Sequence, residues 1–463
     1  MNPASDKVYL IPALRAASTS EQEHSLSGIT VLGFKSIERE RTLRFNRLTI
    51  LAGANSSGKS SIMQPLLLQK QTVEAEYDAS PFALDGPNVS FDRREQLLSR
   101  NATSMRIGLE SSSGRSIAVE YRSSPKESKG KAFDVCWQQF KDLDGTFTFR
   151  EGMSPKEIDQ LVEPQVATTV RDQLRINQTV PWELLQDRSF LSIGLGVRGV
   201  PQSLYYSSPG RFVFWNHLTN IIHLPGLRTS PQRNYPVANV TGKYRGTFDR
   251  YTASVIARWE DSDSDRIKAL AGDLLWLGLT NAIRTDYVSD SSVGILVGRT
   301  TRPRPVPKRR SHKRDSEDLV NIADVGLGVS QVLPVLVALI AAVRNQIVYL
   351  EQPEIHLHPL AQLRLARIIA RAVRSGVKVV VETHSSVLLR GLQTEIARGT
   401  IPFDAANLYW FRKRGTATQI DLAVLDERGS FGDWPLNFGD VRLQADRDYL
   451  LAVQKQSDST ASS

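Results

Sequence analysis

The sequence predicts an α/β fold in which parallel strands carry a glycine-rich loop. Residues 53–61 form that loop, and residues 48–51 just ahead of it have the pattern of a buried strand. Two further apolar runs, 347–350 and 377–381, lie on either side of the amphipathic residues 359–374. Strands buried on both faces of a sheet are nearly continuous apolar runs, and helices connect them when they run parallel. The order of these segments therefore predicts a parallel sheet covered by helices.

The glycine-rich loop has the spacing G-x-x-x-x-G-K-S. Its glycines let the backbone wrap a polyphosphate with several N–H groups pointing inward, and the helix that follows adds positive potential. Lys59 is then placed to reach the β- and γ-phosphates, and the Ser60 hydroxyl to bind Mg²⁺. The sequence therefore predicts binding of ATP or a similar nucleoside triphosphate with Mg²⁺. The expected contacts are Gly53, Asn55, Ser56, Ser57, Gly58, Lys59, Ser60 and Ser61.

The composition sets outer limits on the protein. Its 463 residues suggest two or three domains, or one domain with a large insertion. Cys136 is the single cysteine, which excludes an internal disulfide or a thiolate zinc cluster and fits a cytoplasmic location. The longest apolar run, 332–343, contains a proline and is too short to span a bilayer. The net charge of +9 permits nucleic acid or other acidic partners without requiring them.

We expect five segments along the chain. Residues 26–110 and 321–453 would form the two parts of one head, and residues 111–320 an inserted α+β region. Short alternating runs in that insertion predict strands, and helical patterns follow them. The polar ends, 1–25 and 454–463, are expected to be flexible.

Three polar motifs accompany the apolar strands of the second half. Residues 351–354, Glu-Gln-Pro-Glu, follow the strand at 347–350, where an acidic residue can hold Mg²⁺ or can simply start a helix. Residues 382–385, Glu-Thr-His-Ser, follow the next strand. Residues 324–331, Asp-Val-Gly-Leu-Gly-Val-Ser-Gln, open the apolar helix that precedes the acidic strand. The order of these motifs after a phosphate loop favours the nucleotide-binding interpretation.

With these motifs in this order, the chain resembles the soluble ABC-type ATPases of the RecF/SMC/OLD-like group. It is most similar to the ATPases of bacterial anti-phage systems such as Septu and PARIS. That resemblance implies an ABC-type P-loop ATPase head with a large α+β insertion; most of 76–220 matches no familiar segment. It rests on Phe34-Lys35-Ser36, the phosphate loop, Leu224 to Tyr235, Glu351 to Pro359, Glu382 to Ser385 and the Trp434-Pro435 region.

The resemblance also implies how the motifs act. Residues 326–331 stand where such ATPases carry their signature, so that Gly328 and Ser330, with Gln331 beside them, would contact the γ-phosphate bound to an opposite subunit. ATP would then be sandwiched between two heads and would drive their closure, which makes a homodimer the smallest assembly. His384 would be the switch histidine that touches the γ-phosphate, the alternative being a hydrogen-bonded histidine at a strand end.

One departure from that group concerns hydrolysis. Its acidic strand ends in Asp-Glu, whereas here the pair is Glu351-Gln352. Glu351 can still serve Mg²⁺, but Gln352 can only orient a water and cannot accept its proton. We expect slow hydrolysis in which Glu354 helps; a long-lived closed state is the alternative. A glutamine after the first helix often senses Mg²⁺ in this group, and the pattern does not choose between Gln69, Gln71 or a solvent-facing role for both.

Several other residues have more than one interpretation. Residues 302–314 hold seven Lys or Arg side chains among prolines, and could follow a nucleic-acid backbone, bind an acidic protein or form a solvated loop. Arg228 and Arg233 could bind phosphates or pair structurally. His356 and His358 have a spacing that can chelate zinc, but no third soft ligand is near.

These features predict a regulatory ATPase of a bacterial anti-phage defence complex that controls a separate effector such as a nuclease. The alternatives are a RecF-like DNA-repair or recombination ATPase that clamps DNA, and an ATP-binding scaffold. Only about eighty residues follow His384, which is short for a nuclease domain. The Asp446-Arg447-Asp448 run has the spacing of a metal dyad, but it lies in the helical-looking residues 441–453.

Overall fold

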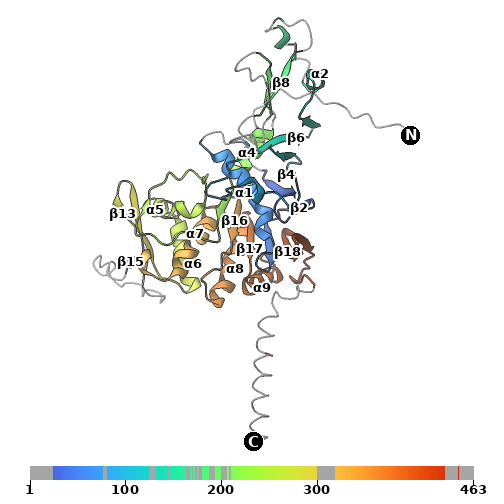
Figure 1. The fold of residues 1–463 in the computed structure, drawn as a ribbon. Helices are drawn as coiled ribbons and strands as arrows, with labels where there is room; N and C mark the ends of the chain where they lie inside the picture. Colours follow the sequence, from blue (N-terminus) through green and yellow to red (C-terminus); the bar gives the residue numbers. More distant parts are fainter. Residues whose placement is uncertain are drawn as a thin grey trace, which may run out of the picture.

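The computed structural model is a head with two flanking lobes (Figure 1). The glycine-rich loop lies at the carboxyl end of a strand inside the central sheet of the head. The basic residues 302–314, Trp434-Pro435, nearly all of 1–25 and of 441–453, and the tail 454–463 lie outside the described residues. The structure describes residues 24–76, 81–124, 132–143, 145–162, 210–299 and 319–432, together with residue 447 and short stretches between 167 and 207.

A six-stranded sheet forms the centre of the head. Its strands are parallel from β11 to β18, and β19 closes one edge in the antiparallel direction. The apolar strands expected from the sequence are confirmed as β3, β16 and β17. In order, the strands are β11 (Ile222–Leu224), β16 (Ile347–Glu351), β17 (Lys378–Thr383), β3 (Leu48–Gly53), β18 (Ala406–Arg414) and β19 (Ala417–Ala423).

Helices cover both faces of this sheet, which explains the continuous apolar character of its strands. Side chains alternate between the faces, so Ile50 and Ala52 join a core with α7, α8 and α9, whereas Leu51 joins a second core with α1. The expected apolar helix begins at Leu327, earlier than its apolar run, and ends at Ala341. The helices are α1 (Lys59–Glu74), α7 (Leu327–Ala341), α8 (Pro359–Arg374) and α9 (Ser386–Ala397).

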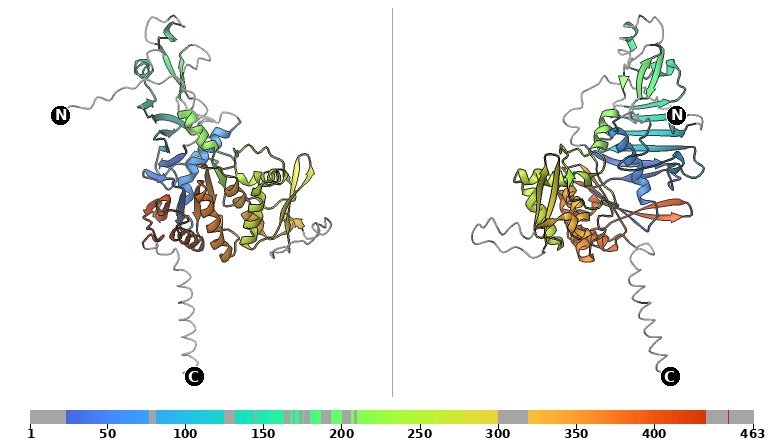
Figure 2. Two further views of the ribbon diagram at one scale, coloured as in Figure 1. Left: turned by 180° about the vertical axis from the view of Figure 1, so that it is seen from behind. Right: turned by 60° about the vertical axis from the view of Figure 1, so that its left-hand side comes forward.

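A second, antiparallel sheet packs over α1 and shares its core. Figure 2 shows its blue and teal strands as one ladder above the head. Its order is β2 (Arg41–Arg44), β1 (Leu26–Leu32), β4 (Ser104–Ser111), β5 (Ser116–Ser123), β6 (Phe133–Lys141) and β7 (Thr146–Arg150). Beyond it lie α2 (Pro155–Asp159), β8 (Trp182–Gln186), β9 (Ile193–Val197), β10 (Tyr206–Ser207) and α4 (Gly210–Thr219).

The other lobe packs its helices against α7 and α8. Residues 252–277 belong to the helical patterns expected in the insertion, and they form two helices, because Asp263 adopts a φ of 46° and the Ser264 side chain caps a new helix by accepting from Arg266 N. Among the described residues, no helix has the length and apolar character needed to cross a membrane. The elements are α5 (Thr252–Asp261), α6 (Asp265–Leu277), β12 (Tyr235–Pro236), β13 (Ile283–Ser289), β14 (Ser292–Gly298) and β15 (Leu319–Asn321).

Candidate nucleotide site

The glycine-rich loop connects β3 to α1 and rests on the β18–β19 hairpin. Gly58 has a φ of 93°, and a Cβ built there would lie 2.1 Å from the Thr418 hydroxyl oxygen, so no other residue fits without rearrangement. Thr418 Oγ1 donates to the Ser57 carbonyl oxygen at 3.0 Å and lies 2.7 Å from Ser36 Oγ. These contacts fix the loop from the side opposite α1.

Lys59 is buried within the curve of its own loop. Its Nζ donates to the carbonyl oxygens of Gly53 at 3.0 Å and Ala54 at 2.8 Å. Burial lowers the pKa of Lys59 to about 8, although the Glu382 carboxylate offsets part of that effect. His384 Nδ1 lies 3.3 Å from the ammonium and 2.9 Å from the Gly53 carbonyl oxygen. The two side chains expected to face the γ-phosphate therefore meet at one point of the loop.

Glu382 is a second carboxylate beside the loop, to which the sequence motif gave no role. It accepts a hydrogen bond from Ser60 Oγ at 2.8 Å and another from the Tyr349 hydroxyl at 2.8 Å. Burial, followed by repulsion from Glu351, raises the pKa of Glu382. The register pairs Glu351 with Glu382 across β16 and β17. The sequence did contain a signal for this role of Glu382. Two apolar runs each end in glutamate, and the carboxyl ends of neighbouring parallel strands meet at one edge of a sheet.

Glu351 is held by a buried histidine on the edge strand β11. His223 Nε2 lies 3.0 Å from Glu351 Oε1, and Gly226 N donates to Oε2 at 3.1 Å. The imidazole stacks on the Tyr349 ring, and its Nδ1 lies 2.9 Å from Asn88 Nδ2, so that Nε2 carries the proton donated to Glu351. Burial by itself raises the pKa of Glu351, but the His223 and Gly226 hydrogen bonds outweigh it and the net pKa is lowered. Sequence reasoning missed His223, whose only signal is a lone polar residue in an apolar run.

Ser60 and Glu351, the two expected Mg²⁺ ligands, line one cavity of about 550 Å³. Lys35 and Gln64 line the same cavity and are joined by a hydrogen bond of 2.7 Å from Lys35 Nζ to Gln64 Oε1. With Glu382 bound to the Ser60 hydroxyl, the donor set is one hydroxyl and two carboxylates. Such hard oxygen ligands suit Mg²⁺, which keeps its remaining positions for waters and phosphate oxygens. The residues present therefore fit this ion.

Replacing His223 with alanine is expected to weaken Mg²⁺ binding, because Glu351 loses the donor that fixes its orientation. Loss of such a supporting hydrogen bond typically costs about 10- to 100-fold in metal affinity. The Mg²⁺ concentration that gives half-maximal ATP hydrolysis should rise by that factor. The matched control is His217→Ala, which removes a half-buried imidazole that is hydrogen-bonded to Ser111 rather than to Glu351. An unchanged Mg²⁺ requirement in His223→Ala would contradict this assignment.

Glu354 and Gln352 occupy the turn that follows β16. Glu354 is buried, and its Oε1 accepts from Thr383 Oγ1 at 2.5 Å and from His384 N at 3.3 Å. Burial raises the pKa of Glu354. Gln352 has a φ of 44°, and its backbone N–H donates to the Glu382 carbonyl oxygen at 2.8 Å. The turn thus folds back onto the segment that carries His384.

Arg228 joins the signature helix to the acidic strand. It is 9% exposed, and its guanidinium donates to the carbonyl oxygens of Gln331 at 3.1 Å and Glu351 at 3.0 Å. Of its two sequence-based interpretations, these contacts are those of structural pairing. Ser330 Oγ donates to the Leu327 carbonyl oxygen at 3.2 Å, within the first turn of α7. Through its two hydrogen bonds, Arg228 therefore connects the first turn of α7 to the strand end at Glu351.

The expected signature residues do not meet the phosphate loop of their own chain. Among the described residues, no hydrogen bond joins 326–331 to 53–61. Gly326 and Gly328 instead line a separate cavity of about 750 Å³. Gly326 and Leu327 are exposed and Gly328 is half-buried, whereas Ser330 and Gln331, the other residues expected to face an opposite nucleotide, are buried.

Gln69 and Gln71 are both buried, so the solvent-facing alternative is wrong for both. Gln71 donates from Nε2 to the Val89 carbonyl oxygen at 3.0 Å and accepts at Oε1 from Val89 N at 3.0 Å, which fixes the loop that carries Asn88. Gln71 therefore stabilises the loop from which Asn88 contacts His223.

The remaining candidate residues have structural contacts. Arg233 forms an exposed ion pair with Asp324 at 2.7 Å, next to the signature. His358 caps α8, its Nδ1 accepting from Leu360 N at 3.4 Å, and His356 adopts a φ of 64° in the turn before it. Across the part of the chain that the structure describes, no three His, Cys, Asp or Glu side chains gather to hold a metal ion.

A protein-family comparison matches residues 212–390 to an AAA domain, described as a putative AbiEii toxin of a type IV toxin–antitoxin system. Residues 212–390 are therefore similar to an AAA domain. The matched part of this AAA domain includes the signature, the acidic strand and His384, and it covers less than half of the 463 residues. A search of curated protein sequences returned no match.

Solved structures with detectable similarity include three SMC heads. One is an SMC head bound to the C-winged helix domain of ScpA, with 12% identity, a TM-score of 0.45 and coverage of 87% of this chain and 98% of that chain. The SMC head domain from Thermotoga maritima has 14% identity, a TM-score of 0.36 and coverage of 86% and 98%. The Smc head with an extended coiled coil bound to the C-terminal domain of ScpA, from Pyrococcus furiosus, has 11% identity, a TM-score of 0.41 and coverage of 87% and 97%.

The fold class expected from the sequence agrees with the structure. The chain has the α/β fold of ABC-type P-loop heads, in which the loop joins β3 to α1 and the acidic strand β16 lies two places away in the sheet. The α+β elements between α1 and α7 interrupt the head, and one of them, β11, enters its central sheet.

Proposed function

We propose that the protein binds ATP and Mg²⁺ between two copies of its head, hydrolyses the ATP slowly, and uses head closure to regulate a separate effector. The observation that carries this proposal is the convergence of Lys59, Ser60, Glu351 and His384 at the carboxyl edge of three neighbouring strands. Ligands of parallel α/β sheets bind at that edge.

Each of these residues has a distinct part in the proposed reaction. Lys59 and the backbone of the phosphate loop hold the β- and γ-phosphates, and Ser60 and Glu351, with Glu382 beside them, hold Mg²⁺. Bound Mg²⁺ neutralises charge on the phosphate oxygens. His384 faces the γ-phosphate from the end of β17. Gln352 orients the attacking water but cannot remove its proton, which is why we expect slow turnover.

Glu354 is proposed to act through His384. Its Oε1 already accepts from Thr383 and from the His384 backbone, so it fixes the segment that must face the γ-phosphate. The alternative role, as the base that takes the proton from water, depends on the carboxylate being charged.

Two substitutions of Glu354 separate these roles. Glu354→Ala is expected to lower the hydrolysis rate by about 10- to 100-fold, because it leaves the Thr383 hydroxyl and the His384 N–H without their acceptor. Glu354→Gln should retain most of the rate, since the amide oxygen still accepts. A rate lower by about 100- to 10,000-fold in Glu354→Gln would instead identify the general base. An unchanged rate in Glu354→Ala would exclude both roles.

The signature supports the two-head arrangement. Gly328 and Ser330 lie at the amino end of the fifteen-residue helix α7, where backbone N–H groups and the helix dipole favour an anion. Because this helix end does not contact its own phosphate loop, a second copy is needed to bring the two together. Regulation of an effector is supported by the sequence resemblance to anti-phage ATPases and by the toxin–antitoxin description of the matched family.

The test is purification of the chain together with the products of its neighbouring genes, with and without ATP, followed by mass identification. A co-purifying nuclease or toxin that is held or released according to nucleotide would support the proposal. A lone oligomer that carries DNA, with DNA-stimulated hydrolysis, would replace it with the RecF-like clamp.

A further inference from the structure

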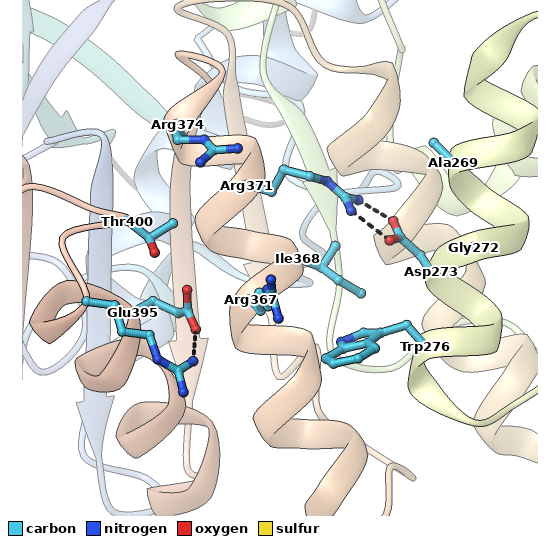
Figure 3. Close-up of a pocket in the computed structure, with 11 residues that line it drawn as sticks. Ala269, Gly272, Asp273, Trp276, Arg367, Ile368, Arg371, Arg374, Glu395 and Thr400 are labelled. Atoms are coloured by element: carbon cyan, nitrogen blue, oxygen red, sulfur yellow. Dashed lines mark hydrogen bonds and ion pairs between the residues drawn. The ribbon is translucent and has the colours of Figure 1, made fainter.

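A cavity of about 780 Å³ lies on the outer side of α8, between α6 and the residues around the end of α9 (Figure 3). None of its lining residues belongs to the nucleotide cavity or to the signature cavity. It is therefore a separate cavity of the head. Its lining residues are Ala269, Gly272, Asp273, Trp276, Arg367, Ile368, Arg371, Arg374, Glu395, Arg398 and Thr400.

The groove is defined by a stripe of arginines along α8. Arg364, Arg367, Arg371 and Arg374 follow one another at intervals of three and four residues, which places them on one face of the helix. Ten residues of helix extend over about 15 Å, so the stripe can meet several anionic groups in a row. The opposite face of α8 is buried in the core of the head. The arginines therefore form the solvent side of this helix.

The stripe carries more positive charge than its surroundings neutralise. Arg371 is paired with Asp273, and Arg398 across the groove is paired with Glu395, as the dashed lines of Figure 3 show. Within the described part of the chain, Arg367 and Arg374 have no carboxylate partner and no hydrogen-bond acceptor, and both are exposed. Two guanidinium groups are thus available to an anion.

An aromatic side chain stands beside these free charges. Trp276, in the last turn of α6, is 43% exposed. The guanidinium groups of Arg364 and Arg367 lie 5.1 Å and 5.4 Å from its ring centre, and Arg364 Nη1 donates to the Trp276 carbonyl oxygen at 2.7 Å. The two guanidinium groups therefore lie against the indole, and the exposed part of its ring remains available to a planar ligand.

We propose that this groove binds single-stranded nucleic acid, with phosphates at Arg367 and Arg374 and a base stacked beside Trp276. A charged groove with stacking surfaces is the general arrangement for binding single strands without sequence preference. An acidic peptide would use the arginines but would not need an exposed aromatic ring beside them. A duplex keeps its bases stacked inside and would leave it unused as well.

The test measures binding of a fluorescently labelled oligothymidylate to the full chain by anisotropy, in the absence of ATP and at several salt concentrations. The double variant Arg367→Glu/Arg374→Glu should bind at least about tenfold more weakly. Its plot of log affinity against log salt should be shallower by about 1.4, because each lost phosphate contact on a single strand contributes about 0.7. Trp276→Ala should bind several-fold more weakly, and Trp276→Phe should restore most of that affinity.

The matched control is Lys413→Glu/Arg414→Glu, which reverses two exposed charges at the end of β18. This control should leave the affinity for oligothymidylate unchanged, and all groove variants should keep the basal ATPase rate, since none of them touches the nucleotide site.

Three results would overturn the assignment. The wild-type chain could fail to bind oligothymidylate, or the groove variants could bind it as well as wild type does. Polyglutamate could also bind in its place and be lost with the same arginines, which would assign the groove to an acidic protein. Because the assay contains no ATP, none of these results depends on the proposed ATPase cycle.

Discussion

Replacing Lys59 with alanine is expected to lower the rate of ATP hydrolysis by about 100- to 1000-fold, the usual effect of removing a group that stabilises developing charge. The fold should survive this change. Burial lowers the Lys59 pKa to about 8, so the charged ammonium is disfavoured in the folded state, and its removal offsets the loss of its hydrogen bonds to the Gly53 and Ala54 carbonyl oxygens. Thermal unfolding and ATP turnover measured on one preparation would check both statements.

The same lysine predicts a pH dependence. Below about pH 8 the Lys59 ammonium is already charged, so ATP binding there needs no additional proton at this group. Above that pH the lysine must take up a proton to bind the phosphates, so ATP affinity should fall by up to about tenfold per pH unit. Lys59→Ala should lack this decline.

Lys378 provides the matched control for both experiments. It lies at the amino end of β17, its Nζ donates to the Leu26 carbonyl oxygen at 3.0 Å, and burial lowers its pKa to about 8 as well. Lys378→Ala removes a lysine of similar pKa from the opposite end of the sheet, and it should keep ATP hydrolysis. Equal losses in the two variants would mean that Lys59 acts through the fold rather than through phosphate.

Gly328→Asp is expected to lower hydrolysis by about 100- to 1000-fold while its own phosphate loop still binds ATP. The carboxylate would stand at the amino end of α7, where it repels the γ-phosphate of the opposite subunit. Space is available, because Gly328 lines an open cavity and a Cβ there would lie 3.4 Å from its nearest neighbour, the His356 carbonyl oxygen. An acidic residue in the first turn also favours the helix itself.

Three measurements check the Gly328→Asp prediction. Labelled-ATP binding should be retained and hydrolysis should be lost. ATP should also no longer raise the molecular mass of the protein in solution from that of one chain to that of a dimer. Gly328→Ala, which adds no charge, should stay close to wild type in all three. Loss of ATP binding in Gly328→Asp would place the signature at the nucleotide of its own chain.

The sequence predicted the central part of the site because each element there has a local signal. Residues 48–51 and 347–350 are apolar on both faces and flanked by helix patterns, and Gly58 and Lys59 belong to a loop of fixed spacing. Parallel pairing then determines that Glu351 and the loop lie at the same sheet edge. These parts of the fold follow from local pattern and connectivity alone.

Other parts depend on contacts between distant segments, which no local pattern reveals. β11 has three residues and comes from the region expected to be inserted, yet it pairs with β16 and brings His223 to Glu351. Asn88 reaches His223 only because Gln71 fixes its loop. The arginine stripe of α8 was visible as helical spacing, but Trp276 joins it from a helix almost ninety residues earlier.

The most direct test of the two-head account is to mix two inactive variants, Lys59→Ala and Gly328→Asp, and to measure ATP hydrolysis. In a mixed dimer, one site contains both defects and the other contains an intact phosphate loop facing an intact signature. With free exchange, half of the dimers are mixed and each has one working site of two, so about a quarter of the wild-type rate should return. A mixture that stays as inactive as its components, despite confirmed subunit exchange, would contradict the account.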